Sequence, residues 1–305
     1  MSIDAQLNAG DLPPRARRGS GRKPRRGGRW LLIALASTVL VFGLLTLAVV
    51  NAPGWDAVRE QFLDGDSFVE SAPRIIAHFW VNVRLFVIAE VLILAWGLVL
   101  AVLRGLPGPV MFPVRLLATA YVDLFRAVPG VLVIFMLGLG VPGLRLPGVP
   151  RDPFFWGVVA LTLIYSAYVS EVFRAGLESV HPSQAAAARS LGLTQFQALR
   201  HVVVPQAVRR VIPPLLNDFI GLQKDTVLVS FIGVVEIFRQ SQINAQADFN
   251  FTPYLVTALV FIVLTIPLAR ITDWLVARER DRRYGAGGRT GTARARRGHV
   301  LGGGR

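Results

Sequence analysis

Six long apolar runs, separated by polar segments, set the pattern of hydrophobic and polar positions along this chain. The runs lie at residues 31–50, 79–103, 114–140, 154–170, 211–238 and 253–276. A helix needs ~20 mainly apolar residues to cross the hydrocarbon core of a bilayer, so each run can supply one span with some tilt. The pattern therefore predicts an all-α membrane protein with six transmembrane helices, of which the fifth is the least apolar.

The first apolar run differs from a secretory signal peptide. A signal peptide has an apolar core of only about 7–15 residues and ends in a small-residue cleavage site. The run is longer than that and has no Ala-x-Ala at its end. We therefore expect residues 30–50 to form an uncleaved transmembrane helix.

Basic residues flank the apolar runs at both ends of the chain. The tails, residues 1–29 and 279–305, are rich in Arg and Gly, and we expect both to be disordered. Lys and Arg next to membrane spans mark the cytosolic side, and six spans put both termini on that same side. The segment 51–78, in which acidic residues outnumber basic ones, then falls outside as an extracytoplasmic loop.

The composition excludes several classes of function. Only 17% of the residues are charged while 53% are hydrophobic, which is unlike a soluble domain. The tails carry much of the net charge of +14 without interleaved aromatic residues, so we expect membrane lipid rather than nucleic acid as their partner. The chain has no Cys, and its four His residues follow no metal-ligand spacing, so we expect no metal site.

A polar, helix-prone segment between the fourth and fifth runs is longer than a bare connection needs. It reads QAAAARSLGLTQFQALRHVVVP at residues 184–205 and falls on the cytosolic side. Pro182 is placed to open a short helix and Gly192 to stop it, after which Thr194 can cap a second helix that Pro205 ends or bends. From the residues alone, a hairpin that only packs on its own spans and a docking surface are both open.

This segment also resembles a known motif. Permease subunits of bacterial ATP-binding-cassette (ABC) importers carry Glu-Ala-Ala, three residues, Gly, nine residues, then Ile-x-Leu-Pro. The chain matches at Ala187, Ala188, Gly192 and Pro205, and departs at Ala186, where the family usually has Glu.

Two further matches narrow the resemblance to importers of polar amino acids. They are Phe-Arg-x-x-Pro at residues 125–129 and Lys-Asp-Thr at residues 224–226. The resemblance covers roughly residues 79–278. It implies a type I ABC importer permease core of five spans, to which residues 30–50 add one, in a bacterial inner membrane.

The resemblance implies a mechanism and a set of partners. Residues 173–208 would form a coupling segment that docks on an ABC ATPase dimer, with contacts from Gln184, Ala186, Ala187, Ala188, Gly192, Leu193 and Pro205. An extracytoplasmic amino-acid-binding protein would deliver the cargo, with glutamate or glutamine favoured, and a second permease copy or sister permease would complete the pore. The chain has no Gly-x-x-x-x-Gly-Lys-Ser/Thr phosphate loop, so ATP would be bound by the partner, and we expect no cofactor, no catalytic residue and no enzyme activity in this chain.

Polar residues inside the spans are candidates for the substrate path. A charge at bilayer depth costs about 2.5–3.5 kcal/mol on insertion scales, so it usually faces a cavity or a partner. Asn217, Gly221, Lys224 and Asp225 share one helical face, and we favour an ion pair that fastens the bundle over direct contact with cargo. The other candidates, with weaker support, are Arg126, Pro129 and Glu90.

Two other functional classes remain open. An ion-coupled secondary transporter or channel would use Lys224 and Asp225 as its charged centre. A membrane scaffold would use only the basic tails. The segment around Gly192 favours the importer, because a self-sufficient carrier has no need of it.

Overall fold

The computed structural model describes the backbone of residues 28–297 and the side chains of residue 30 and residues 32–278. The described residues form helices, with no strand among them. The chain divides into two units, residues 1–57 and 58–305. Most of the N-terminal tail, residues 1–27, and the last eight residues, 298–305, lie outside the described part.

The first unit contains one apolar helix, α1 (Gly28–Val50). Its span-forming stretch Leu32–Val50 has no buried residue. A helix that is apolar on all sides is suited to contact with lipid. This matches the expected transmembrane helix at residues 30–50.

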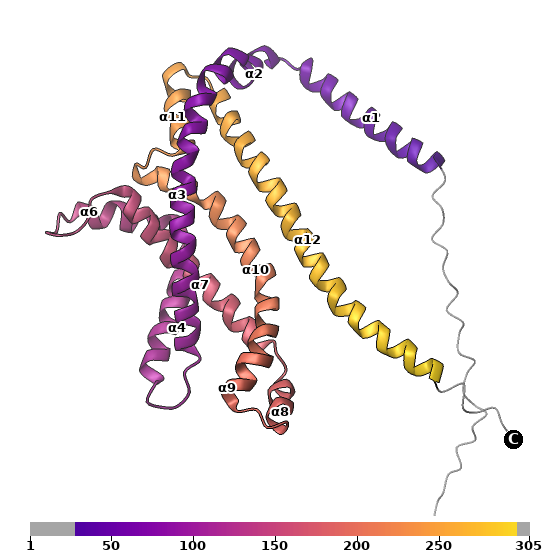
Figure 1. Cartoon of the computed structure of the whole chain (residues 1–305). Coiled ribbons are helices and arrows are strands. Elements are labelled where there is room, and N and C mark those ends of the chain that lie inside the picture. Colours follow the sequence, from indigo (N-terminus) through magenta and orange to yellow (C-terminus); the bar gives the residue numbers. More distant parts are fainter. Residues whose placement is uncertain (1–27, 298–305) are drawn as a thin grey trace, which may run out of the picture. The chain divides into compact units, whose positions relative to one another are not determined.

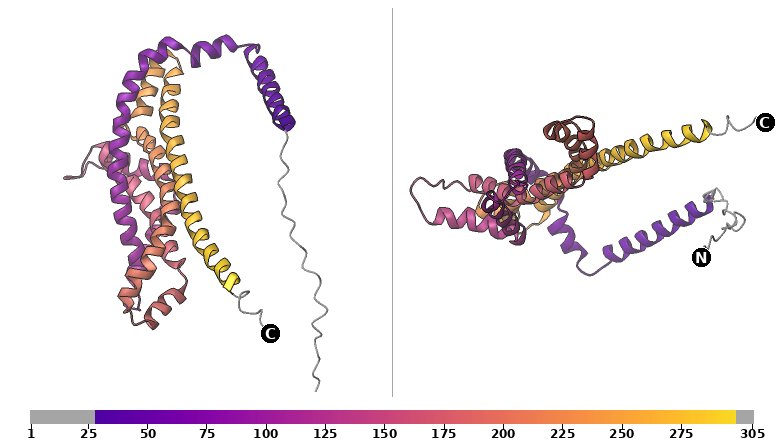
Figure 2. Two further views of the ribbon diagram at one scale, coloured as in Figure 1. Left: turned by 45° about the vertical axis from the view of Figure 1, so that its right-hand side comes forward. Right: turned by 90° about the horizontal axis from the view of Figure 1, so that it is seen from below.

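The boundary between the units falls within α2, and the second unit holds the rest of α2 and the described helices that follow it (Figure 1). In chain order they are α2 (Trp55–Phe62), α3 (Gly65–Arg104), α4 (Phe112–Ala127), α5 (Gly130–Phe135), the π-helical η1 (Met136–Gly140), α6 (Val141–Gly143), α7 (Pro153–Glu178), α8 (Pro182–Ser190), α9 (Gln195–Ala198), the π-helical η2 (Leu199–Val203), α10 (Val204–Asp225), the 3₁₀-helical η3 (Thr226–Ile232), α11 (Ile237–Asp248) and α12 (Thr252–Arg297). Within this unit, α8 and α9 lie at one end and α11 at the other, while α3 and α12 run side by side near α11 (Figures 1 and 2).

The segment 51–78 is helical, and the expectation that it forms a loop is wrong. The Asp64 side chain accepts hydrogen bonds from the backbone N–H groups of Asp66 and Ser67, at 3.0 and 3.4 Å, and so starts α3 well before the apolar run. Over 40 residues α3 is about 60 Å long, twice the thickness of the hydrocarbon core. Its first turns therefore project beyond a bilayer that its apolar part crosses.

Among the described residues, four helices are long and apolar enough to cross a membrane. One pair of helices that meet at a bend would make a fifth span if the pair is treated as a single crossing. The four stretches are Leu32–Val50, Trp55–Arg104, Pro153–Glu178 and Thr252–Arg278. The fifth predicted span, now α10 and η3, is not among them, since α10 carries five charged residues and three prolines. It packs against α7 and α12 inside the bundle nonetheless. The count of six spans therefore stays a prediction.

The third predicted span is broken. The bent pair is α4 with the stretch Gly130–Gly143, which meet at 105°. Val128 and Pro129 have extended ψ angles of 131° and 128° at the break. Pro129 lacks an N–H and disfavours helical backbone in the residue before it, which is why a continuous apolar run does not give a continuous helix.

The last helix is longer than the sequence predicted. The backbone of α12 is helical as far as Arg297, whereas we expected a disordered tail from residue 279. The stretch 277–283 reads ARERDRR, and Ala, Arg and Glu have high helix propensity, so the helix continues after the apolar run has ended.

The core of the second unit lies where α3 and α7 pack together. Leu85, Ile93 and Leu161 are at most 1% exposed there, with Leu222 and Val229 against them. Gly97 of α3 permits the closest approach, because a Cβ at this position would lie 2.8 Å from Val169 Cγ1 and 3.3 Å from the Ser166 carbonyl oxygen. Small residues at such contacts allow two helix backbones to approach in a membrane protein.

A buried polar cluster holds the irregular stretch between η3 and α11 against α3. Glu236 is fully buried and caps α11 by accepting hydrogen bonds from the backbone N–H groups of Phe238 and Arg239. Asn82 Nδ2 donates to Glu236 at 2.8 Å and to Thr226 Oγ1 at 3.1 Å. Non-helical backbone at this depth is tolerated because such partners satisfy it.

The contact at Gly97 gives a prediction for stability. We expect Gly97→Ala to lower the free energy of unfolding by about 1–3 kcal/mol, because the added methyl group overlaps Val169. Thermal unfolding of the detergent-purified protein measures the effect. Gly43→Ala in α1 is the control, because a Cβ there meets no atom within 4 Å. An unchanged melting temperature for Gly97→Ala would contradict the close contact.

Candidate functional site

The segment between α7 and α10 forms a helical elbow, which we define as residues 181–203. His181 opens it, with Nδ1 accepting a hydrogen bond from the Ser183 backbone N–H at 3.2 Å, and Pro182 is the first residue of α8. The helix ends at Ser190, and Gly192 has φ +92°, a left-handed conformation that favours glycine. The predicted start and stop of the first short helix are confirmed.

The second arm of the elbow begins at Thr194. A capping box forms there, since the Thr194 hydroxyl accepts from the Gln197 backbone N–H and the Gln197 side chain accepts from the Thr194 N–H. The sequence predicted that Pro205 either ends or bends this second arm, and the prediction that it ends the arm is wrong. The π-helical turns of η2 lead without a break into α10, and Pro205 lies in the first turn of that helix, where its missing N–H costs little.

Two alanines anchor the elbow to the rest of the unit, and two of its large apolar side chains point away from it. Ala188 and Ala198 are only 6% and 2% exposed. By contrast Leu191 is 83% exposed and Phe196 68% exposed, one on each side of Gly192. The elbow therefore does not bury its large apolar side chains against its own spans.

The residues expected to make coupling contacts are divided between these two faces. Ala188 is buried and Leu193 half-buried, while the other five are exposed, namely Gln184, Ala186, Ala187, Gly192 and Pro205. Sequence reasoning did not single out Leu191 or Phe196. A large apolar residue beside a helix-stopping glycine in a polar segment was the signal that could have found them.

The charge on the elbow is entirely basic. No Asp or Glu occurs between Glu178 and Asp218. Arg189, Arg200 and His201 are exposed on the two arms. The replacement of the usual Glu by Ala186 leaves this surface without a carboxylate of its own.

The stretch of α7 that leads into the elbow carries a cluster of ion pairs centred on Glu171. One carboxylate oxygen, Oε1, lies 3.3 Å from Nη2 of Arg104 and 3.2 Å from Nη1 of Arg126. The other, Oε2, lies 2.8 Å from Nε of Arg174, which also pairs with Glu178 at 2.6 Å. Arg126, a candidate for the substrate path, is thus part of this cluster.

The candidate path residues of α10 meet a tyrosine that sequence reasoning missed. Tyr165 of α7 donates a hydrogen bond to Asp225 Oδ2 at 2.7 Å. Its hydroxyl oxygen would lie 3.3 Å from a Cβ at Gly221, so this glycine leaves room for the ring. The sequence favoured fastening of Lys224 and Asp225 to neighbouring spans, and Asp225 does bond to a neighbouring helix, although the partner is a tyrosine and not a charged residue. Lys224 is exposed and forms no ion pair within the described residues.

The remaining path candidates come from three helices and the break after α4. Asn217 is exposed one turn before Gly221 on α10, and Pro129 is exposed at the break after α4. Glu90 of α3 is half-buried and close enough to Asp218 of α10 to interact with it electrostatically. The Arg126 guanidinium lies over the ring of Tyr168, which is 6.4 Å from the ring of Tyr165.

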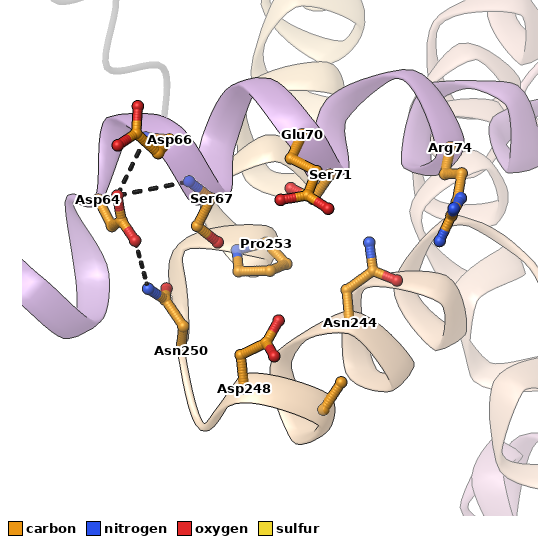
Figure 3. Close-up of a pocket in the computed structure, with 11 residues that line it drawn as sticks. Asp64, Asp66, Ser67, Glu70, Ser71, Arg74, Asn244, Asp248, Asn250 and Pro253 are labelled. Carbon is orange, nitrogen blue, oxygen red and sulfur yellow. Dashed lines mark hydrogen bonds between the residues drawn. The ribbon is translucent and has the colours of Figure 1, made fainter.

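A polar cavity of about 420 Å³ lies at the opposite end from the elbow, between the start of α3 and the α11–α12 turn (Figure 3). Its acidic lining residues are Asp64, Asp66, Glu70 and Asp248. Asp64 is partly used, since Oδ2 accepts a hydrogen bond from Asn250 at 3.0 Å. Within the described residues no group of His, Cys, Asp or Glu is arranged to hold a metal ion.

Two comparisons with known sequences agree with the geometry of the elbow and bundle. Residues 93–281 match the family described as binding-protein-dependent transport system inner membrane component. A probable glutamine ABC transporter permease protein of Bacillus subtilis (strain 168) is 38% identical over 195 residues, or 63% of this chain and 88% of that protein. A glutamate/aspartate import permease protein of Escherichia coli O157:H7 is 31% identical over 221 residues, or 70% of this chain and 97% of that protein.

A solved structure supports the same assignment. The crystal structure of an amino acid ABC transporter with histidines has a chain that is 31% identical and superposes with a TM-score of 0.65. The match covers 70% of this chain and 98% of that one. The chain belongs to the family of binding-protein-dependent transport system inner membrane components, and within it to the amino-acid ABC transporter permeases.

Proposed function

We propose that this chain is the permease subunit of an ATP-driven importer of a polar amino acid, and that the elbow transmits force from a separate ATPase subunit. The single observation that carries the proposal is the exposure of Leu191 and Phe196 on either side of Gly192. Exposed large apolar side chains on a rigidly capped turn indicate a protein partner. The capping at Thr194 and the anchors Ala188 and Ala198 fix the direction in which they project.

The elbow, both termini and the ATPase dimer share the cytosolic side in this proposal. ATP binds to the ATPase and not to this chain, which acts as a transport component without an active site or cofactor of its own. The cavity near the start of α3 then faces the outside, where an amino-acid-binding protein delivers cargo. A second permease copy, or a sister permease, completes the pore.

The proposed cargo is a polar amino acid, with glutamate or glutamine favoured. Support comes from two relatives, of which the Bacillus subtilis protein is named as a probable glutamine permease and the Escherichia coli protein as a glutamate/aspartate import permease. Support also comes from the polar side chains of α10. Asp225 with Tyr165, and Lys224, which is the next-to-last residue of α10 and follows Asn217 by seven positions, offer groups for both charged ends of an amino acid.

Movement of cargo requires two states of the bundle. ATPase closure pulls the elbow, the ends of α7 and α10 follow, and the path opens alternately to each side. The break between α4 and α5 supplies a place where the backbone can change direction without loss of regular helical hydrogen bonds.

Reconstituted vesicles test this proposal directly. The chain is combined with the ATPase and binding protein encoded beside its gene, and uptake of labelled glutamine and glutamate is measured. We expect uptake that needs internal ATP and the binding protein and that persists after ion gradients are collapsed. Uptake driven by an ion gradient without ATP would contradict the proposal and favour a secondary transporter.

The exposed apolar pair gives a sharper prediction. Leu191→Ser with Phe196→Ser removes two side chains whose burial in a partner contributes about 1.5–3 kcal/mol each, so ATPase affinity should fall at least tenfold. Co-purification of the ATPase with the permease measures the loss. Val110→Ser is the matched control, since Val110 is 79% exposed in the α3–α4 connection and outside the elbow. Equal ATPase retention by the double variant and the control would rule out the elbow as the docking site.

A further inference from the structure

We propose that Glu171 is a positioning residue that passes the movement of the elbow from α7 to the inner end of α3 and to the break after α4. The inference rests on the proposed function and concerns the step after ATPase docking. It is carried by the ion pairs around Glu171 and by the places in the fold where its arginine partners lie.

One carboxylate joins three helices. Arg104 is the last residue of α3, and Arg126 is the next to last residue of α4. Both share Oε1 of Glu171, at 3.3 and 3.2 Å. The four ion pairs found within the described residues all belong to this cluster. Because a single acceptor holds both arginines, α3 and α4 cannot keep these contacts unless they follow α7.

The residue of α4 that pairs with Glu171 lies close to the bend between α4 and α5. Arg126 lies two residues before Val128, where helical backbone gives way to the 105° bend. Its guanidinium also lies over the ring of Tyr168, 5.9 Å from the centroid, one turn before Glu171 on α7. Two side chains of α7, Tyr168 and Glu171, thus contact Arg126 next to the break. A small displacement at this position changes the direction of α5 more than a displacement elsewhere in α4.

The other end of the chain of contacts reaches the elbow. Arg174 links Glu171 to Glu178, the last residue of α7, at 2.8 and 2.6 Å. The Arg210 guanidinium of α10 donates a hydrogen bond to the Ser179 carbonyl, which ties together the two helices that carry the elbow. A cavity of about 330 Å³ beside this contact is lined by Glu171 and Arg210 among others, so the junction has room to move.

If the ion pairs around Glu171 only held the helices together, we would expect every hydrogen-bond donor in the cluster to have a partner. Arg104 has a side chain only 10% exposed, and its Nη1 is buried with no hydrogen-bond partner among the described residues. Partly buried ion pairs contribute little net stability because desolvation opposes their attraction. They do impose a specific geometry, which is what transmission of movement requires.

The test is Glu171→Gln in the assembled complex in vesicles, with uptake per ATP hydrolysed as the readout. We expect this ratio to fall about fivefold or more, the size of coupling changes typical of such networks, while ATPase binding stays near that of the unchanged protein. The melting temperature should also fall, because the buried Arg104 guanidinium loses its carboxylate, so the ratio and not the melting temperature decides the test. Glu60→Gln in α2 is the matched control, because Glu60 is exposed, lies outside the cluster and forms no ion pair within the described residues. It should change the ratio less than twofold.

A double-mutant cycle separates transmission from fastening. Arg126→Gln should lower the ratio as Glu171→Gln does, and the double variant should be no worse than either single one. An unchanged ratio in Glu171→Gln would overturn the proposal, as would a lower melting temperature with the ratio intact. If the unchanged protein shows no ATP-dependent uptake, the proposed function itself fails and this inference fails with it. If the unchanged protein shows ATP-dependent uptake, the ratio measured for Glu171→Gln tests this inference alone.

Discussion

The close contact between α3 and α7 is the constraint on which the rest of the structure depends. Gly97 lets Val169 and the Ser166 carbonyl approach α3, and two residues beyond Val169 the Glu171 carboxylate meets Arg104 at the end of that helix. The same alignment of α3 along α7 is therefore required for the apolar contact and for the ion pair. Since α7 leads directly into the elbow, the helix most firmly packed in the core is also the helix that a cytosolic partner would move. Packing and proposed function meet in the same element.

The sequence predicted the parts that depend on local rules. Apolar runs located the four helices that are long and apolar enough to span a membrane within the described residues, and the cap at Thr194 and the stop at Gly192 followed from side-chain chemistry within a few residues. The broken third span did not follow from hydropathy, because both sides of Pro129 are equally apolar and only the backbone restriction of proline separates them. The early start of α3 was missed because the cap at Asp64 lies among acidic residues that looked like a solvated loop.

Contacts between distant residues account for what sequence reasoning missed at the candidate site. Lys224 and Asp225 were expected to form ion pairs with neighbouring spans, but the partner of Asp225 is Tyr165, an uncharged residue 60 positions away in sequence. Glu171 was not among the residues that the sequence singled out. Its role as a common acceptor for three arginines depends on how α3, α4 and α7 converge, and no spacing within one helix reveals that.

The most direct measurement of the central claim is cross-linking from the tip of the elbow. The chain has no Cys, so Leu191→Cys introduces one thiol at an 83% exposed position, and Val69→Cys one at a 73% exposed position near the start of α3. In membranes containing the complete transporter, a bifunctional reagent should join the elbow thiol to the ATPase subunit and leave the other unjoined to it. Cross-linking to the ATPase from residue 69 instead of residue 191 would contradict both the docking surface and the orientation.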